Sequence, residues 1–502
     1  MSAAMQFVGR DYLDTLEVSV GAPVLEAGFA SRLVAEADDL QALLMLLGRA
    51  DPEKAWTRGS VTALLARMLT ELDRTINSQL NGILHHREFQ ALEANWRGVW
   101  LLTEQAAHND SEGLVRVKVL DLGWRELARD LSRSIEFDQS RLFAKIYSHE
   151  FGSPGGEPFG LLLGAYSVSH RANGGQANLD TLKGLTQIAA AAFAPMILNA
   201  EPGFFGVDRF SELTGVTELS SHFAQPEMAK WRSLRAMDDA RFLGLAVPRM
   251  LMRQPWRDLG QGPEGFGFRE ERNRPDRDFL WGHACFSVGV VAIRAFCESG
   301  WFAQIRGFRS GRVAHGTVDN LPAIQAITPT GGFFSTRSPV DWQVTDRMER
   351  ILAAEGFLPL MPLANTEMLV IHAVPSVQEP EDFDQQDARV SARLAAMLHY
   401  TLCVSRFAHY LKVMGRDRVG DYRSPEECEA QLQRWLHGYT MATEGASDEL
   451  RARFPLRNAS VSVRARVGEP GRYYSVIRLQ PHFQLDQLVT GMRLITELTP
   501  VQ

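Results

Sequence analysis

Apolar residues recur every third or fourth position in the first strongly patterned part of the chain, which lays one apolar stripe along a helix. The stripe is formed by Leu64, Met68, Leu72, Ile76, Leu80 and Ile83. After a break at His85 and His86, the segment HREFQALEANWRGVWLLTEQA predicts a second helix. We therefore expect a helical region over residues 59–110, preceded by an N-terminal arm, residues 1–58, with one or two short helices.

Strand and helix patterns alternate through the middle of the chain. Val115, Val117 and Val119 alternate with charged residues and predict a half-buried strand. FGLLLGAYSV reads as a buried strand, and the alanine-rich LDTLKGLTQIAAAAFA reads as a helix. Farther along we expect a helix from about Ala284 to Glu298, a strand over WFAQIRGF, a helix over VTDRMERILAAEG and one long helix ending near Gly415 or Gly420. This alternation predicts an α/β core over residues 111–420.

Residues 421–502 are predicted to form a C-terminal helix, a hairpin and a linking strand. In the first hairpin strand Val461, Val463, Ala465 and Val467 alternate with polar residues. GEPG makes the turn, and RYYSVIRLQPHF returns as the second strand. The segment MRLITELTPVQ, with Leu494, Ile495, Thr496 and Leu498, is a further strand candidate. Exposed strand edges pair with other chains, so we expect these two segments to link subunits.

The glycine-rich stretch EFGSPGGEPFGLLLGAYSV resembles a phosphate-binding loop only in composition. Such a loop leaves a strand and opens a helix, whose N-terminus supplies oriented N–H groups. Here the predicted helix DQSRLFAKIYSHEF comes first and the strand second. We expect Gly152, Gly155 and Gly156 to form a tight turn with positive φ.

Composition excludes several classes of protein. The 502 residues are 45% hydrophobic, as in an ordinary globular protein, and a net charge of -7 does not favour nucleic acid as a partner. Four cysteines without a CxxC pair predict reduced thiols rather than disulfides or zinc. No leader segment and no run of roughly 20 apolar residues is evident, so we expect a cytoplasmic protein without membrane insertion.

The sequence shows no assembled catalytic site. His149 and Glu150 lack the second histidine of HExxH, and His283, His399 and His409 have no spaced carboxylates. No GxSxG elbow surrounds a serine, and no cysteine has a recognisable histidine partner. We expect no catalytic residue, no metal and no cofactor.

Several long segments of the sequence, from about Ile76 to the C-terminus, resemble the large subunit of the type VI secretion contractile sheath, the TssC/VipB family. These segments are EFQALEANWRGVWLL, SIEFDQSRLFAKIYSHEFGSPGGEPFGLLLGAY, MAKWRSLRAMDDARFLGLAVPRMLMRQPW, DFLWGHACF, GWFAQIRG, TDRMERILAAEGFLPL, VSRFAHYLKVMGRDRVG and PHFQLDQLVTGMRLITEL. The resemblance implies a contractile tail-sheath fold with mixed sheets and C-terminal strands that join neighbouring subunits.

The resemblance also implies partners. It predicts pairing with the small sheath subunit TssB/VipA, helical self-assembly around the Hcp tube, attachment to a baseplate, and disassembly by the ClpV ATPase. By position alone, the ATPase would grip an N-terminal helix that includes Phe29, Leu33 and Val34. Two alternatives stay open at this point: the sheath of a phage-like injection particle, and an α/β enzyme with an unrecognised pocket.

Overall fold

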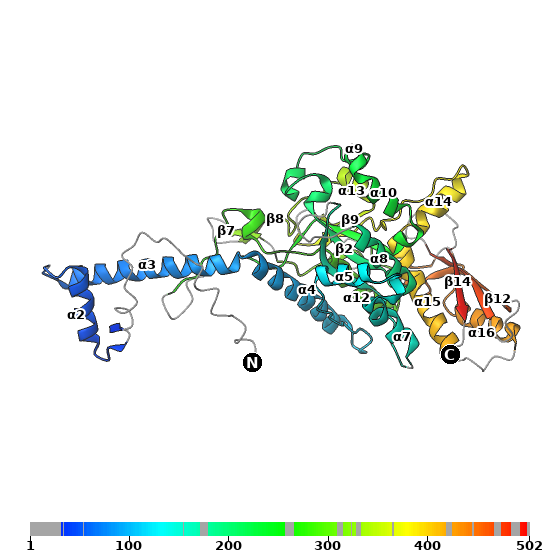
Figure 1. The fold of residues 1–502 in the computed structure, drawn as a ribbon, viewed down its shortest axis with the longest axis horizontal. Helices are drawn as coiled ribbons and strands as arrows, with labels where there is room; N and C mark the ends of the chain where they lie inside the picture. Colours follow the sequence, from blue (N-terminus) through cyan, green and yellow to red (C-terminus); the bar gives the residue numbers. More distant parts are fainter. Residues whose placement is uncertain are drawn as a thin grey trace. The chain divides into compact units, whose positions relative to one another are not determined.

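The computed structural model describes residues 32–33, 35–53, 55–153, 155–170, 179–256, 266–308, 315–322, 324–327, 333–363, 366–417, 424–443, 446–465, 473–482 and 492–498. The chain divides into two compact units. One comprises residues 1–79 with 262–267, and the other comprises residues 80–261 with 268–502. Figure 1 colours the chain from blue at the N-terminus to red at the C-terminus.

The first unit contains α2 (Asp39–Ala50) and most of α3 (Arg58–Leu84). Asp38 begins α2 by accepting a hydrogen bond from the Leu40 N–H at 3.0 Å, as an N-cap residue does. The predicted helical stripe is confirmed by α3, and the helix after the two histidines is α4 (Arg87–Asn109). Much of the α3 stripe is accessible, since Leu72 is 55% exposed.

The second unit is built on a four-stranded parallel sheet with the order β1-β2-β3-β9. These strands are β1 (Leu162–Val168), β2 (Met196–Ala200), β3 (Leu243–Val247) and β9 (Phe357–Pro359). Successive side chains point to opposite faces, so Leu198 joins one apolar cluster and Ile197 the other. The sheet is therefore buried on both faces, as parallel sheets usually are.

Each face of this sheet is covered by helices. On one face, α8 (Leu179–Ala191) and α10 (Ala229–Arg235) contribute to a cluster in which Trp231 and Phe357 are fully buried. On the other face, α12 (Cys285–Ser299) packs between the sheet and α4. The predicted mixed α/β class is confirmed.

The remaining helices and strands surround this sheet. The helices are α5 (Trp124–Arg133), α6 (Arg141–Phe143), α7 (His149–Gly152), α9 (Ser220–Phe223), α11 (Pro275–Asp278), α13 (Asp346–Ala354), α14 (Gln386–Ala395), α15 (Leu398–Asp417), α16 (Pro425–His437) and α17 (Asp448–Arg453). The strands are β4 (Met250–Leu251), β5 (Trp281–Gly282), β6 (Thr317–Val318), β7 (Ile324–Ile327), β8 (Phe333–Arg337), β10 (Met361–Pro362), β11 (Leu369–Val370), β12 (Leu456–Ala465), β13 (Tyr473–Pro481) and β14 (Met492–Leu498).

The predicted strand over Val115–Val119 is wrong. Residues 114–120 form no strand, because no described segment pairs with them in a ladder. The Asp110 carboxylate instead accepts hydrogen bonds from the N–H groups of Leu114 and Val115, at 2.9 and 2.7 Å. Val119 is 61% exposed, so the alternating pattern here does not mark a buried face.

Two further predictions need correction. WFAQIRGF is not a strand, although Trp301, Phe302 and Ile305 are buried, because residues 301–308 have no ladder partner among the described strands. The long helix after residue 385 is two helices, α14 and α15. They separate where Ser376 donates from its N–H to the Ala396 carbonyl and Leu398 donates to the Val374 carbonyl.

The glycine-rich loop before β1 is a turn between a helix and a strand, as its helix-first order predicted. The positive φ predicted for three glycines is found at Gly155 alone, because Gly152 is the last residue of α7 and Gly156 does not have a positive φ. Gly155 has φ of +79°, a conformation that glycine adopts without strain. At Gly156 a Cβ atom would lie 2.2 Å from the Glu150 carbonyl oxygen. Both glycines therefore serve backbone geometry.

Candidate assembly interface

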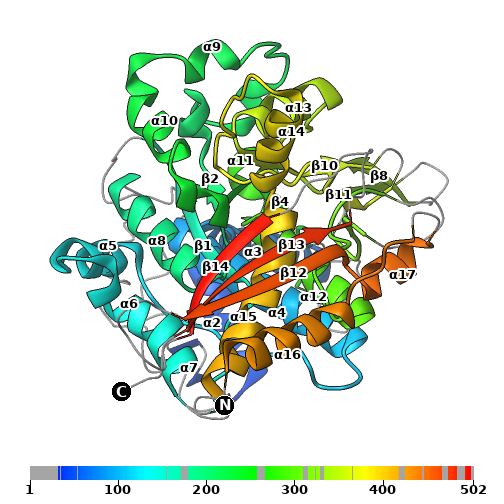
Figure 2. The same ribbon diagram turned by 90° about the vertical axis from the view of Figure 1, so that its right-hand side faces the viewer.

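The C-terminal part of the chain forms a three-stranded antiparallel sheet with the order β12-β13-β14. The predicted hairpin pairs Val461 with Ile477 and Val463 with Ser475. The predicted terminal strand returns to its own chain, where Leu494 lies opposite Ile477 on the other side of β13. Figure 2 shows the three strands side by side.

This sheet packs against α15 and α16. Val461 and Val463 are each 7% exposed and belong to an apolar cluster with Phe407 of α15 and Leu432 of α16. The alternation of the first hairpin strand thus places its valine side chains in the core of this region. Any pairing with another chain through β12 would use its backbone edge.

The other predicted linking residues lie in or beyond the described strands. Ala465 ends β12, and β14 contains Leu494, Ile495, Thr496 and Leu498. Val467, Phe29 and Val34 lie outside the described residues. Leu33 is half-buried in a short helical stretch, and its carbonyl accepts from the Glu36 N–H at 3.4 Å. The roles of all these residues in binding partners stay predictions.

A second surface, which the sequence patterns above did not predict, lies on α4. Phe89, Leu92, Trp96 and Trp100 follow one face of this helix and are 38%, 57%, 62% and 59% exposed. We call these four residues the α4 aromatic face. A contiguous apolar patch of this kind marks an interaction site, and tryptophan is enriched among residues that dominate binding energy.

The opposite side of α4 is fixed to α12. Ala94, Leu101 and Leu102 are buried there, and Gly98 approaches the Phe286 ring closely. Apolar residues therefore lie on two sides of the helix. That pattern was readable from the sequence, because one side alone suffices to bind a helix to a core.

Ionisable groups in the core lack the features of catalytic nucleophiles. Burial raises the pKa of the Cys285 and Cys403 thiols to about 12 each. Burial also lowers the pKa of His283 to about 4 and that of His409 to about 3, so both imidazoles are neutral at pH 7. Within the described residues, no group of three or more His, Cys, Asp or Glu side chains could hold a metal ion.

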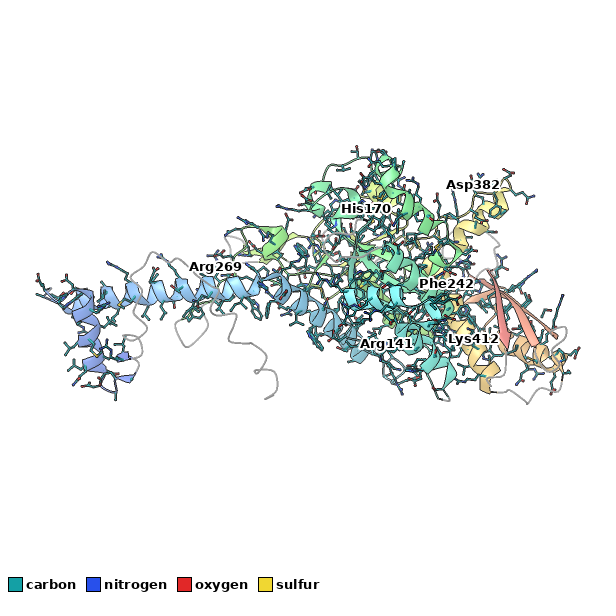
Figure 3. All side chains as sticks on the ribbon, viewed as in Figure 1. Arg141, His170, Phe242, Arg269, Asp382 and Lys412 are labelled. Carbon is teal, nitrogen blue, oxygen red and sulfur yellow. The ribbon has the colours of Figure 1, made fainter. Side chains whose placement is uncertain are left out.

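Lys412 of α15, labelled in Figure 3, is a buried amine whose pKa burial lowers to about 8. Its ammonium lies 4.6 Å from the Phe193 ring centroid, 5.1 Å from that of Tyr147 and 5.2 Å from that of Phe151. The surrounding rings satisfy the cation through cation–π attraction. This arrangement gives the lysine a packing role.

The sheet topology and the cavities give little support to the alternative that the chain is an α/β enzyme. A cavity of about 330 Å³ has a lining that includes Arg306, His399, Tyr400, Asp448, Arg451 and His482. Burial lowers the pKa of His399 to about 3, which leaves it a poor proton acceptor. The parallel strands run in chain order across the sheet, so there is no reversal of strand order at which open α/β sheets bind their ligands.

Among the described residues, no helix is both long and apolar enough to cross a membrane.

Comparison with known proteins gives consistent matches over most of the chain. The family described as EvpB/VC_A0108, tail sheath N-terminal domain, matches residues 66–378. The family described as EvpB/VC_A0108, tail sheath gpW/gp25-like domain, matches residues 387–498. The chain is 35% identical over 435 residues to the type VI secretion system sheath protein TssC1 of Pseudomonas aeruginosa strain PAO1, which covers 86% of this chain and 85% of that protein. The chain belongs to the TssC/VipB family of type VI secretion sheath proteins.

Proposed function

We propose that the chain is the large structural subunit of a contractile sheath in the cytoplasm. It pairs with the small sheath subunit TssB/VipA, polymerises helically around the Hcp tube and contracts to propel that tube. The observation that carries this proposal is family membership over residues 66–378 and 387–498 together with the terminal three-stranded sheet. The named relative is a type VI secretion protein, which favours this system over a phage-like particle.

Contraction of a sheath requires that neighbouring subunits stay connected while they move relative to one another. Backbone hydrogen bonds between strands of different subunits can hold neighbours together while the bodies of the subunits rotate and slide. The doubly covered parallel sheet supplies a rigid body, and β14 is an outer strand of the C-terminal sheet among the described strands, so a further strand could pair with it. Contraction would then be the relaxation of one packing of rigid bodies to a more stable packing.

The α4 aromatic face is a second contact of the assembled sheath. Four exposed apolar side chains on one helix face are costly in water, at about 25 cal/mol for each Å² of apolar surface. We expect the small subunit to cover this face. The baseplate and the ClpV ATPase remain expected partners on the strength of the family resemblance, and Phe29 and Val34, assigned to the ATPase contact, lie outside the described residues.

Co-expression with the small subunit tests the function and this contact together. The wild-type chain should sediment as large particles that appear as tubules by electron microscopy. A double variant, Trp96→Ser with Trp100→Ser, should lose at least about tenfold in small-subunit capture, because two exposed anchors of an interface are removed. The control is Ile135→Ser, since Ile135 is 90% exposed and lies outside the α4 aromatic face.

Two results would contradict these statements separately. A wild-type chain that stays a small closed oligomer with its partner would overturn the sheath function. If the tryptophan variant captured the small subunit normally yet formed no tubules, the face would instead lie between copies of the large subunit.

A further inference from the structure

The helix α16 lies along β12, as Figure 2 shows. Ser424 caps its first turn by accepting from the Glu427 N–H at 3.2 Å. Leu432 and Leu436 are buried in the same apolar cluster as the β12 valines. Packing therefore fixes the rotation of α16 and with it the direction of the polar side chains next to β12.

Two of these polar side chains hydrogen-bond to the β12 backbone. The Val461 N–H donates to Gln433 Oε1 at 2.8 Å, and Gln433 Nε2 donates to the Ala459 carbonyl at 2.9 Å. The Val463 N–H donates to Glu429 Oε2 at 2.8 Å. The primary amide of Gln433 thus supplies one donor and one acceptor to the strand, as a peptide group of a neighbouring strand would.

These backbone groups lie on the outer edge of β12. In an antiparallel pair, the N–H and C=O groups of alternate residues point toward the partner strand and away from it. Val461 and Val463 share one direction, and their N–H groups donate to α16 rather than to β13. They therefore belong to the row that an added strand would use.

The spacing of the two elements makes this match possible. Residues four apart on a helix are separated by about 6 Å along its axis, and residues two apart on a strand by about 6.8 Å. Glu429 and Gln433 are four apart, and Val461 and Val463 are two apart. The helix side chains can accordingly reach successive outward N–H groups of β12 without distortion.

Resting on the proposed sheath function, we infer that Glu429 and Gln433 close the β12 edge, so that a strand from a neighbouring sheath subunit adds only along β14. A strand that paired with β12 would have to displace both side chains and leave a partly buried carboxylate and amide to find new partners. β14 forms the other outer edge of the sheet among the described strands. Because of these two side chains, further strands can be added to the sheet at the β14 edge and not at the β12 edge.

Hydrogen exchange of the full chain with its small subunit tests this inference, before and after assembly into tubules. Peptides covering residues 492–498 should exchange at least about tenfold more slowly after assembly, because new interchain hydrogen bonds protect them. Peptides covering residues 458–464 should exchange slowly in both states. Protection gained on assembly at residues 458–464 would overturn the inference while leaving the sheath function intact. Failure to assemble at all would contradict both.

A double variant, Glu429→Leu with Gln433→Leu, opens the edge while keeping apolar contact. Exchange at residues 458–464 of the unassembled complex should accelerate about tenfold, since three hydrogen bonds are lost. Gln431→Leu, the same substitution elsewhere on α16, should leave that exchange unchanged. Unchanged exchange over residues 196–200 of β2 would show that the variant is folded. Unaltered exchange at residues 458–464 in the double variant would refute the closure.

Discussion

Arg253 joins carboxylates from two distant segments of the chain. Its guanidinium makes bonds of 2.6 and 3.0 Å to Glu270 and one of 2.7 Å to Glu93 of α4. Glu270 also accepts from the Trp256 N–H at 2.8 Å. Arg253 and Glu270 are 6% and 2% exposed, so the pairing is desolvated and depends on every member being present.

Arg253→Met should destabilise the second unit by about 3–5 kcal/mol, because it leaves the buried Glu270 carboxylate without its guanidinium partner, whereas Glu93 keeps its 2.9 Å bond to Arg97. The apparent melting temperature of the complex with the small subunit measures this loss. Arg209→Met is the control. The Arg209 side chain is 58% exposed and forms a 3.4 Å ion pair with Asp276, so its replacement should cost less than about 1 kcal/mol of stability. Equal melting temperatures for the two variants would show that the Arg253 network is not a structural support.

At the scale of elements, α4 connects the core to the α4 aromatic face. A Cβ atom on Gly98 would lie 2.2 Å from the Phe286 ring of α12. Gly98→Ala should therefore push the helices apart and cost about 1–3 kcal/mol. Gly82→Ala is the matched control, because nothing lies within 4 Å of its added Cβ, and it should stabilise the helix by up to about 1 kcal/mol. A Gly98→Ala variant with an unchanged melting temperature and unimpaired small-subunit capture would contradict this tight approach.

Elements with a complete local signal were predictable from the sequence. The helix α3 has a sustained three-and-four spacing, and the sequences of β12 and β13 alternate on both sides of the segment GEPG, for which the sequence predicts a turn. The strand predicted over Val115–Val119 failed because alternation describes one chain segment, whereas a strand also needs a partner. Likewise, nothing in the local pattern of residues 386–417 shows that residues 374–376 bond to the chain where α14 ends and α15 begins.

The same distinction applies to the candidate interface. The alternation from Val461 predicted which side chains of β12 share a face, and the structure buries Val461 and Val463 together. It could not show that Gln433 and Glu429 occupy the strand edge, because those contacts join residues 28 and 34 positions apart. The α4 aromatic face was visible in the residues, but its exposure depended on which side of α4 meets α12.

At the scale of the whole molecule, the chain combines a rigid body with a proposed linking part. The parallel sheet is covered by helices on both faces, and we propose that the C-terminal sheet connects neighbouring subunits through its β14 edge. This division suits a structural subunit whose work comes from rearranged contacts between bodies.

The most direct test of the linking part is electron microscopy of the chain co-expressed with its small subunit, comparing two truncations. Removal of residues 492–502 deletes β14, whereas removal of residues 499–502 retains it. We predict tubules from the shorter truncation and folded, unassembled complexes from the longer one. Tubules of normal length from the chain that lacks residues 492–502 would contradict the claim that the C-terminal strand links sheath subunits.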